Sequence, residues 1–507
     1  MRHIILTLIL FSINSGYSQV NGLEMFDESY VHEIRVTFEQ ENYWDSLEYY
    51  YEQYLEFGAD KQYMMASVSI DGTVVDSVGV REKGYFSNWG SEGLKEPLKI
   101  DFNEYVSGTK YDGLKKINLQ NGFSDPTIMR DALAYKFMRD AGVAAPRSSY
   151  AKVYLNDTYW GLYLVVEQVD DRFLKNWYEN DNGNIFKCID NTSLEWQGSI
   201  KTNYEDEFGL KTNEELDNWD SFIDLVGKIN DEDEFEDSIS TALQMNSYLR
   251  VLAADVLMYN WDSYYEHGRN FYIYYDSVAS TFQWIPWDYN LAFSTSETNI
   301  VITYDGGMTE TKPLVENVMN SEVYREQYFN HLCVFIDNYF TLENLESYID
   351  DTKALIAEPL EDDPNKYFSI SQFNTNVNTN ITVVDGWGFE TVIPGLKSFI
   401  SSRYATVSSQ LDSYSHSCTA LSIDEVTEEV NSTSLVYPNP SNTGVFNIVF
   451  ANAVQQVSVY NIYGQAMLTE AVSELGQTEL DLSAYADGIY IVELVGETRE
   501  LVRVVKQ

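Results

Sequence analysis

The chain has 507 residues, 44% of them hydrophobic, so it can form more than one domain and bury a sizeable core. Its 32 basic and 79 acidic residues give a formal net charge of −47, which disfavours nucleic acid as a partner. Any phosphate site in this chain must therefore be a local basic pocket, and the acidity favours solubility in a salty or calcium-containing medium.

The N-terminus is typical of a secretory signal peptide. A basic start and a short apolar run from Ile4 to Phe11 precede small and polar residues, with cleavage expected after Ser18. The run is too short to span a bilayer, and no other segment approaches the necessary length. We therefore predict a signal peptide at residues 1–18 and an exported mature chain without a transmembrane segment.

Three cysteines, Cys188, Cys333 and Cys418, show no metal-ligand spacing. Their odd number excludes a fully paired intramolecular set. We expect Cys188 and Cys333 to be small buried hydrophobic residues.

The remaining chain divides into a body, a linker and a tail. The body runs from about Val31 to Tyr414, and a polar stretch at 422–434 has the composition of a linker. In the tail, 435–507, short alternating apolar runs separated by Gly, Asn and Asp indicate a small antiparallel β-sandwich.

The body is expected to be β-rich up to about residue 172, with one helix. Asp71-Gly72 predicts a hairpin turn, and in the strand from Pro97 to Phe102 alternate residues are apolar. Asp125-Pro126 predicts a helix start, with two further strands at 150–155 and 160–167. From about Phe173 the chain becomes mainly helical, so the fold class is α+β.

Basic side chains gather in the first half of the body: Arg81, Lys83, Lys95 and Lys99. Gly84 allows close approach of a ligand to the backbone, and Ser87 adds a donor. A solvated strand face explains such a cluster about as well as a phosphate site does. Lys99 faces away from an apolar row, which favours the phosphate interpretation.

Two aspartates follow apolar elements. A helical stripe leads to Asn260-Trp261-Asp262, and Asp288 follows an apolar strand. A divalent cation at Asp288 and Asn270, with Asp262 as a base, would suit phosphoryl transfer. Turn capping explains Asp262 and Asn270 equally well. A glycosidase carboxylate pair also stays open, whereas nucleotide-hydrolase and serine-hydrolase loop motifs do not stand out.

Seven segments, in order, resemble the CotH-type atypical secreted protein kinases. They are Arg81-Glu82-Lys83-Gly84, Lys95 to Phe102, Met129 to Ala134, Val153-Tyr154-Leu155-Asn156, Gly161 to Glu167, Asn260-Trp261-Asp262 and Ile285-Pro286-Trp287-Asp288. The resemblance implies a two-lobed kinase-like fold with ATP and Mg²⁺ or Mn²⁺ between the lobes.

The resemblance also implies residue roles. Asp262 looks like the catalytic aspartate and Asp288 like the metal-binding one, with Asn270 as a further metal ligand. Lys99, then Lys83 and Arg81, would contact the nucleotide phosphates, and Glu167 would lie near the interlobe hinge. Asn290 stands where members often have aspartate, and its carbonyl oxygen can still bind a metal.

The tail resembles the C-terminal sorting domain of the type IX secretion system. The matching segments are Tyr437-Pro438-Asn439-Pro440, Val459 to Gly464, Leu480-Asp481-Leu482-Ser483 and Asp487-Gly488-Ile489-Tyr490. This implies a Bacteroidetes-type exporter, contact with the secretion machinery, and a secreted or outer-membrane-attached protein.

The sequence thus predicts a metal-dependent kinase acting on Ser or Thr of extracellular or surface proteins. The alternative is a catalytically weak kinase-fold protein with a structural or adhesive role at the surface. A carbohydrate-active surface enzyme is a third reading, based on the acidic, Tyr- and Trp-rich body.

Overall fold

The computed structural model describes residues 20–418 except 85–94, 179, 296–297, 305–309, 385–389, 415 and 417, and residues 435–506 except 438–440, 442, 450–453, 462–465, 473–476, 486–487 and 497–498. The expected signal peptide and linker, and Ser87, lie outside these ranges. The chain separates into two compact units, 1–418 and 419–507, which are treated separately below.

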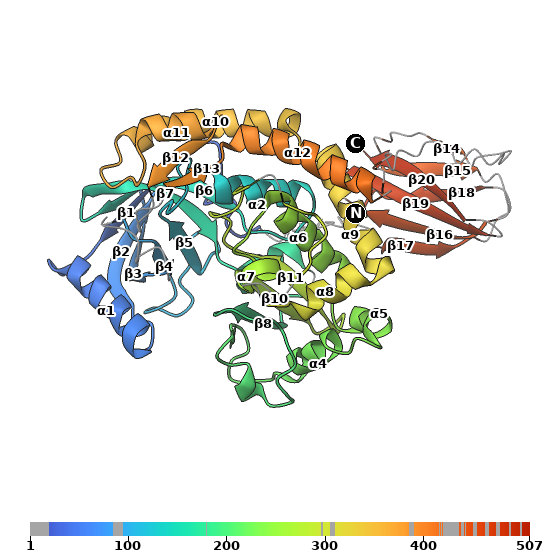
Figure 1. Cartoon of the computed structure of the whole chain (residues 1–507), viewed down its shortest axis with the longest axis horizontal. Helices are drawn as coiled ribbons and strands as arrows, with labels where there is room; N and C mark the ends of the chain where they lie inside the picture. The colour runs from blue at the N-terminus through green and yellow to red at the C-terminus, as the bar shows by residue number, and fades with distance from the viewer. Residues whose placement is uncertain are drawn as a thin grey trace, which may run out of the picture. The chain divides into compact units, whose positions relative to one another are not determined.

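The first part of the body is a closed β-barrel (Figure 1). Its strands follow the order β1-β2-β3-β4-β5-β7-β6, and the parallel pair β1–β6 closes it. Their bounds are β1 His32–Thr37, β2 Met64–Ile70, β3 Thr73–Glu82, β4 Leu98–Asp101, β5 Lys116–Gln120, β6 Ser148–Leu155 and β7 Thr158–Glu167.

Alternation along the strands fills the barrel with apolar side chains, such as Val78, Val80, Leu98 and Ile100, all fully buried. The intervening residues face outward, Lys99 among them, as the sequence predicts. The hairpin between β2 and β3 is confirmed: its turn pairs the two strands through Asp71-Gly72, which have φ of 48° and 86°.

Two expectations about helices in this part are wrong. The helix α1 (Tyr43–Phe57) was not expected; its buried residues Leu47 and Tyr51 lie on one face. The helix expected from Pro126 begins later, as α2 (Arg130–Asp140). Between Asp125 and the helix lies a turn in which Ile128 has φ of 55°. The Asp125 carboxylate accepts hydrogen bonds from Thr127 N within this turn and from Arg130 N at the start of the helix.

The second part of the body surrounds a four-stranded sheet in the order β11-β10-β8-β9. Its strands are β8 Asn184–Cys188, β9 Phe208–Leu210, β10 Phe271–Asp276 and β11 Thr281–Pro286. The helices are α3 Asp171–Trp177, η1 Lys201–Asn203, α4 Asp220–Ile229, α5 Phe235–Ser238, η2 Ile239–Thr241, α6 Met245–Met258, α7 Tyr264–His267, α8 Pro313–Asn320 and α9 Glu322–Asn338.

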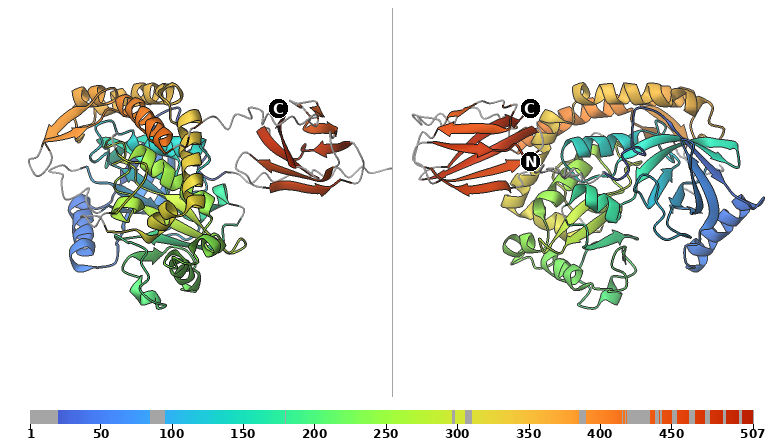
Figure 2. Two further views of the ribbon diagram at one scale, coloured as in Figure 1. Left: turned by 45° about the vertical axis from the view of Figure 1, so that its right-hand side comes forward. Right: turned by 180° about the vertical axis from the view of Figure 1, so that it is seen from behind.

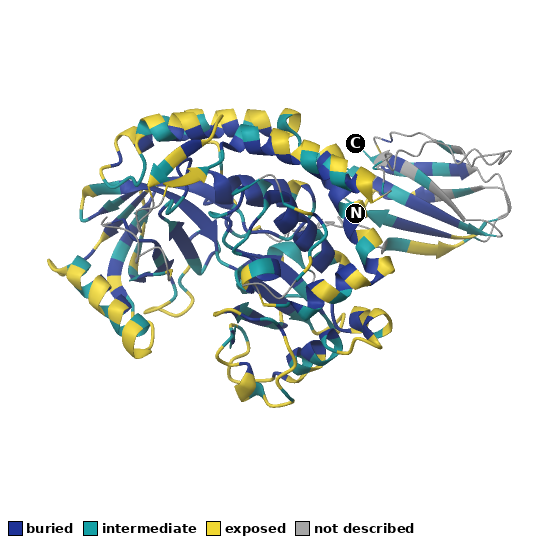
Figure 3. Ribbon diagram, in the orientation of Figure 1, coloured by how far each residue is buried: buried dark blue, intermediate teal, exposed yellow. Residues whose placement is uncertain are grey.

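Three later helices, α10 (Leu342–Glu361), α11 (Ile370–Asn376) and α12 (Leu396–Ser413), lie along one side of the body with the hairpin β12 (Ile381–Val384) and β13 (Glu390–Ile393). α10 contacts β7 of the barrel, α2 and α12, and the two views of Figure 2 show the same layer from other sides. One hydrophobic core occupies the barrel and a second, larger one joins α2 to the helical part (Figure 3).

The cysteine prediction is half right. Cys188 is free and buried, whereas Cys333 on α9 forms a disulfide with Cys418, 85 residues away. Local composition carries no signal for a partner at that separation.

The tail contains two antiparallel sheets that share one core. The sheets are β14-β15-β18 and β17-β16-β19-β20, and Phe446, Val459, Leu480 and Val492 bury their side chains in the core. Their strands are β14 Leu435–Tyr437, β15 Val445–Val449, β16 Val454–Asn461, β17 Ala466–Ala471, β18 Gln477–Asp481, β19 Gly488–Gly496 and β20 Arg499–Lys506.

Candidate functional site

Asp288 follows the β10–β11 hairpin in a left-handed conformation, with φ of 63°. Its backbone N donates to Tyr135 Oη at 2.9 Å, and its Oδ1 accepts from Gln120 Nε2 at 3.3 Å. Positive φ is uncommon for aspartate and tends to occur where surrounding contacts hold a functional side chain. Asp288 is half-buried, so its carboxylate is positioned yet reaches solvent.

Gln120 at the end of β5 joins Asp288 to Lys83 of the barrel. Its Oε1 accepts from Lys83 Nζ at 2.6 Å, while its amide nitrogen donates to Asp288. Burial lowers the pKa of Lys83 to about 8, and Asp288 opposes that shift. One amide therefore places a cation and a carboxylate from distant parts of the chain beside each other.

Asp131 in the first turn of α2 holds the segment after Asp288. Its Oδ1 accepts from Tyr289 N at 2.5 Å. Burial and then repulsion from Asp288 raise the pKa of Asp131 well above its ordinary value. Tyr289 Oη in turn donates to Asp255 Oδ1 on α6 at 2.5 Å. These bonds fix the backbone on which Asp288 stands.

Asp262 lies just after α6, which ends at Tyr259 with φ of 43°. Asn270 Nδ2 donates to the backbone oxygen and to Oδ2 of Asp262, both at 2.9 Å, and Arg269 Nε lies 3.6 Å from Oδ1. Burial raises the pKa of Asp262 to about 6; Arg269 lowers it and Asp288 raises it. Trp287 N donates to Asn270 O at 3.2 Å, so the residue before Asp288 is bonded to the residue that holds the Asp262 carboxylate.

Further cations face this pair of aspartates. Lys187 of β8 lies 5.9 Å and Lys83 lies 5.8 Å from the centroid of the Trp287 ring. Lys99 of β4 donates to Gln168 Oε1, and Arg81 is its register partner on β3. Burial, followed by repulsion from Arg81, Lys187, Lys116 and Lys83, lowers the pKa of Lys99 well below its ordinary value. Such crowding of like charges is the electrostatic pattern of an anion site.

The donor atoms near Asp288 suit a hard divalent cation, which prefers carboxylate and amide oxygens. The Asn270 amide nitrogen is committed to Asp262, which leaves its carbonyl oxygen, and Asn290 Nδ2 likewise donates to Phe123 O at 3.0 Å. Among the described residues, no group of three His, Cys, Asp or Glu side chains could hold a metal. A cation here would depend on Asp288, amide oxygens and oxygens of a ligand.

Glu167 does not point its carboxylate at this cluster. At the end of β7 it accepts from Arg147 Nη2 at 2.5 Å and from Arg147 Nε at 3.0 Å, and it is fully buried. The side chain therefore fixes the end of β7.

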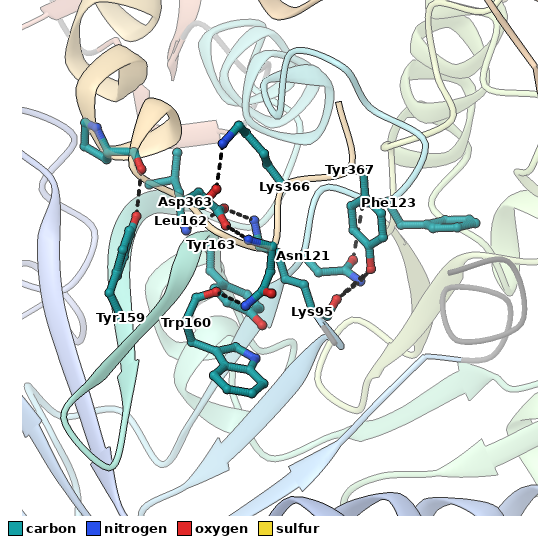
Figure 4. Close-up of polar contacts among 12 residues, drawn as sticks. Lys95, Asn121, Phe123, Tyr159, Trp160, Leu162, Tyr163, Asp363, Lys366 and Tyr367 are labelled. Carbon is teal, nitrogen blue, oxygen red and sulfur yellow. Dashed lines mark hydrogen bonds and ion pairs between the residues drawn. The ribbon is translucent and has the colours of Figure 1, made fainter. Parts of the chain in front are cut away.

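Lys95 is also separate from the cluster, contrary to its grouping with Arg81, Lys83 and Lys99 in the sequence. It is fully buried and pairs with Asp363, just beyond α10, at 2.6 Å (Figure 4). Asp363 Oδ2 also accepts from Leu162 N at 3.0 Å. Lys95 O accepts from Asn121 Nδ2 at 2.7 Å and from Tyr367 Oη at 2.6 Å. This network ties α10 to the residues that flank β4 and β5.

Sequence reasoning missed Gln120, Lys187 and the contact made by Asp131. Gln120 ends a strand and Lys187 alternates with apolar residues, so either could have been a solvated position. Asp131 lies within a segment that matches the kinase family, and this was the available signal for it.

Comparison with known proteins identifies two family matches, one for the tail and one for the body. Residues 435–506 match the secretion system C-terminal sorting domain, so this type IX signal directs the chain to secretion or attachment at the outer surface through the secretion machinery. In the part of the chain that the structure describes, no helix has the length and apolarity of a membrane span.

The body has a curated relative in Bacillus subtilis (strain 168), the inner spore coat protein H. The two are 27% identical over 272 residues, which cover 52% of this chain and 74% of the relative. Residues 80–407 match the family model of the CotH kinase protein, and this span contains the last residues of β3, strands β4 to β7 and both aspartates. The chain therefore belongs to the CotH kinase protein family.

Proposed function

We propose that this chain is an exported kinase that transfers the γ-phosphoryl group of ATP to Ser or Thr of an extracellular or surface protein. The barrel and the helical part would act as the two lobes of a kinase-like body. The observation that supports this most strongly is Gln120, which hydrogen-bonds both Lys83 and Asp288. A paired cation and carboxylate from the two parts is what binding of a metal-bound triphosphate needs.

The proposed roles follow from the contacts. Lys83, Lys99 and Arg81 would bind the phosphates, and Asp288 with the amide oxygens of Asn270 and Asn290 would hold Mg²⁺ or Mn²⁺. The metal, when bound, supplies positive charge between phosphate oxygens. Asp262 would accept the acceptor hydroxyl proton, for which Asn270 and Arg269 orient its carboxylate. Glu167, through Arg147, would shape the strand end beside the adenine.

The test is transfer from radiolabelled ATP to protein, including the chain itself, with Mg²⁺ or Mn²⁺. Asp262→Asn and Asp288→Asn should each lower the rate on the order of a hundredfold or more. Asp231→Asn, an exposed position between α4 and α5, is the matched control and should leave the rate unchanged.

The second candidate is a catalytically weak kinase-fold protein with a structural or adhesive role. Its supporting observations are that no group of three His, Cys, Asp or Glu side chains among the described residues could hold a metal, and that Asn290 stands where family members often have aspartate. Metal-dependent nucleotide binding without any transfer would favour this candidate.

A further inference from the structure

The cations beside the proposed nucleotide site continue outward from it. We define the outer cation group as Lys61, Lys187 and Lys211, which have Arg81 of the proposed phosphate site as a neighbour. Lys61 lies between α1 and β2, and Lys211 directly follows β9, so the group draws on both parts of the body. Lys61 and Lys211 are exposed, whereas Arg81 and Lys187 are half-buried.

Backbone register brings the members of the group together. Lys187 pairs with Gly209 across β8 and β9, and Lys211 Nζ lies only 2.7 Å from where a Cβ on Gly209 would stand. Desolvation, followed by repulsion from Lys187, Arg81 and Lys211, lowers the pKa of Lys61. The group is therefore one region of positive potential.

The outer cations stand against aromatic faces. Lys61 Nζ lies 4.5 Å from the centroid of the Tyr54 ring and Lys187 Nζ lies 5.5 Å from that of Tyr272. Within the described ranges none of the three forms an ion pair with a carboxylate, whereas Lys136, Lys201 and Lys228 each do. Two carboxylates oppose the lowered pKa values in the group: Asp288 raises the pKa of Lys187, and Glu214 raises that of Lys211. In a chain with 79 acidic residues, unpaired cations gathered at one place need a ligand to explain them.

One nucleotide does not account for all of this charge. Lys83, Lys99, Arg81 and a divalent cation at Asp288 already offset a triphosphate, so the outer group exceeds what the nucleotide needs. We propose that the outer cation group binds acidic side chains of the acceptor protein, next to the Ser or Thr that is phosphorylated. This inference rests on the proposed kinase activity and specifies its acceptor.

The reaction is an ordinary phosphoryl transfer. The acceptor hydroxyl oxygen forms a bond to the γ-phosphorus while the bond from that phosphorus to the bridging oxygen of ADP breaks. The hydroxyl proton passes to the Asp262 carboxylate. The outer cations act by holding carboxylates that flank the hydroxyl.

The net negative charge of the chain makes a comparison of acidic, neutral and basic acceptor peptides a sharp test of this proposal. A chain with a net charge of −47 repels an acidic peptide and attracts a basic one, so a preference for acidic peptides requires a local cause. Three peptides of equal length, with one Ser flanked by Glu, Gln or Lys, are compared as acceptors of the full chain with ATP and Mn²⁺. We expect kcat/KM to be about tenfold higher for the Glu peptide than for the Gln peptide, with the difference shrinking in high salt.

The double variant Lys61→Glu/Lys211→Glu should lose this preference while KM for ATP stays unchanged. The control variant Lys110→Glu/Lys175→Glu changes the net charge by the same amount at exposed positions outside the outer cation group, and it should keep the preference for the Glu peptide. Binding of the fluorescein-labelled peptides, followed by anisotropy with ADP and Mn²⁺ present, gives a readout that does not require turnover and should show the same order.

Equal or weaker binding of the Glu peptide, or a preference that survives in Lys61→Glu/Lys211→Glu, would overturn the inference. If transfer to the Gln peptide occurs without a Glu preference, the acceptor inference fails and the kinase proposal stands. If no metal-dependent nucleotide binding is found, the kinase proposal itself fails.

Discussion

At the residue scale, the site depends on amides and buried groups that join charges from distant segments. Gln120 is the clearest case, because it contacts Lys83 and Asp288 with the two ends of one amide. The sequence motifs single out Asp262 and Asp288 as candidates, but they do not identify Gln120, whose neighbours on the chain carry no comparable signal. Its importance lies in contacts that exist only after folding.

We predict that Gln120→Leu weakens metal–nucleotide binding about tenfold, since it removes hydrogen bonds to two charged groups. Calorimetry of the full chain measures the affinity, and thermal unfolding checks that the fold persists. Gln62→Leu, at an exposed position, is the control and should bind as the wild type does. Unchanged affinity in Gln120→Leu would show that the bridge has no part in binding.

Asp255 predicts a pH dependence of stability. Burial raises its pKa to about 7, although hydrogen bonds from Tyr289, Ser263 and Asn260 oppose the shift. The folded state therefore holds the proton more tightly than the unfolded state, and the stability that this gives is complete below about pH 4 and lost as pH rises through 7.

Between these limits this carboxyl should lower the free energy of unfolding by up to about 1.4 kcal/mol per pH unit. Urea unfolding at pH 5, 6 and 7 should show that loss in the wild type relative to Asp255→Asn, and Asp231→Asn should follow the wild type. If the free energy of unfolding changed with pH in the same way in the wild type and in Asp255→Asn, the raised pKa of Asp255 would be contradicted.

At the element scale, the sequence predicted features that depend on adjacent residues but not contacts between residues far apart in the chain. The Asp71-Gly72 turn is confirmed because a two-residue hairpin depends on adjacent residues. Lys95 was grouped with the cations proposed to bind phosphate, yet its partner Asp363 lies 268 residues away along the chain, just beyond α10. The start of α2 was misplaced because Asp125 bonds across a turn before the helix begins.

The Lys95–Asp363 pair should be essential for holding α10 against the barrel. Lys95→Met leaves a fully buried carboxylate unpaired, and we expect a loss of roughly 3–5 kcal/mol in the free energy of unfolding. Lys95→Met/Asp363→Asn should recover part of it. Lys228→Met, which breaks a surface pair with Asp224, should cost less than about 1 kcal/mol in the same denaturation experiment.

The Cys333–Cys418 disulfide closes a loop of 85 residues around α10, α11 and α12. The chain-entropy model gives up to about 4.6 kcal/mol for a loop of this size, and an exported protein meets conditions that keep the bond oxidised. Cys333→Ser/Cys418→Ser should therefore unfold at lower urea, and reductant should destabilise the wild type but not this variant. A wild type indifferent to reductant would argue against the bond.

At the scale of the whole molecule, charge is distributed in two ways. The net charge is −47, while Lys83, Lys99, Lys187 and Arg81 gather near Asp288 and crowd one another. The sequence predicted that a phosphate site needed a local basic pocket, and it placed Arg81, Lys83 and Lys99 there. Lys187 and Lys211 come from the other part of the body, so only the assembled fold reveals the extent of the region.

The central claim is that this region binds a metal-bound nucleotide at Asp288. Calorimetry of ATP into the full chain with Mn²⁺ tests it directly, with Asp288→Ala as the variant and Asp231→Ala as its control. We predict saturable binding by the wild type and the control, lost without the metal and lost in Asp288→Ala. Absence of metal-dependent binding by the wild type, or equal binding by Asp288→Ala, would contradict the claim.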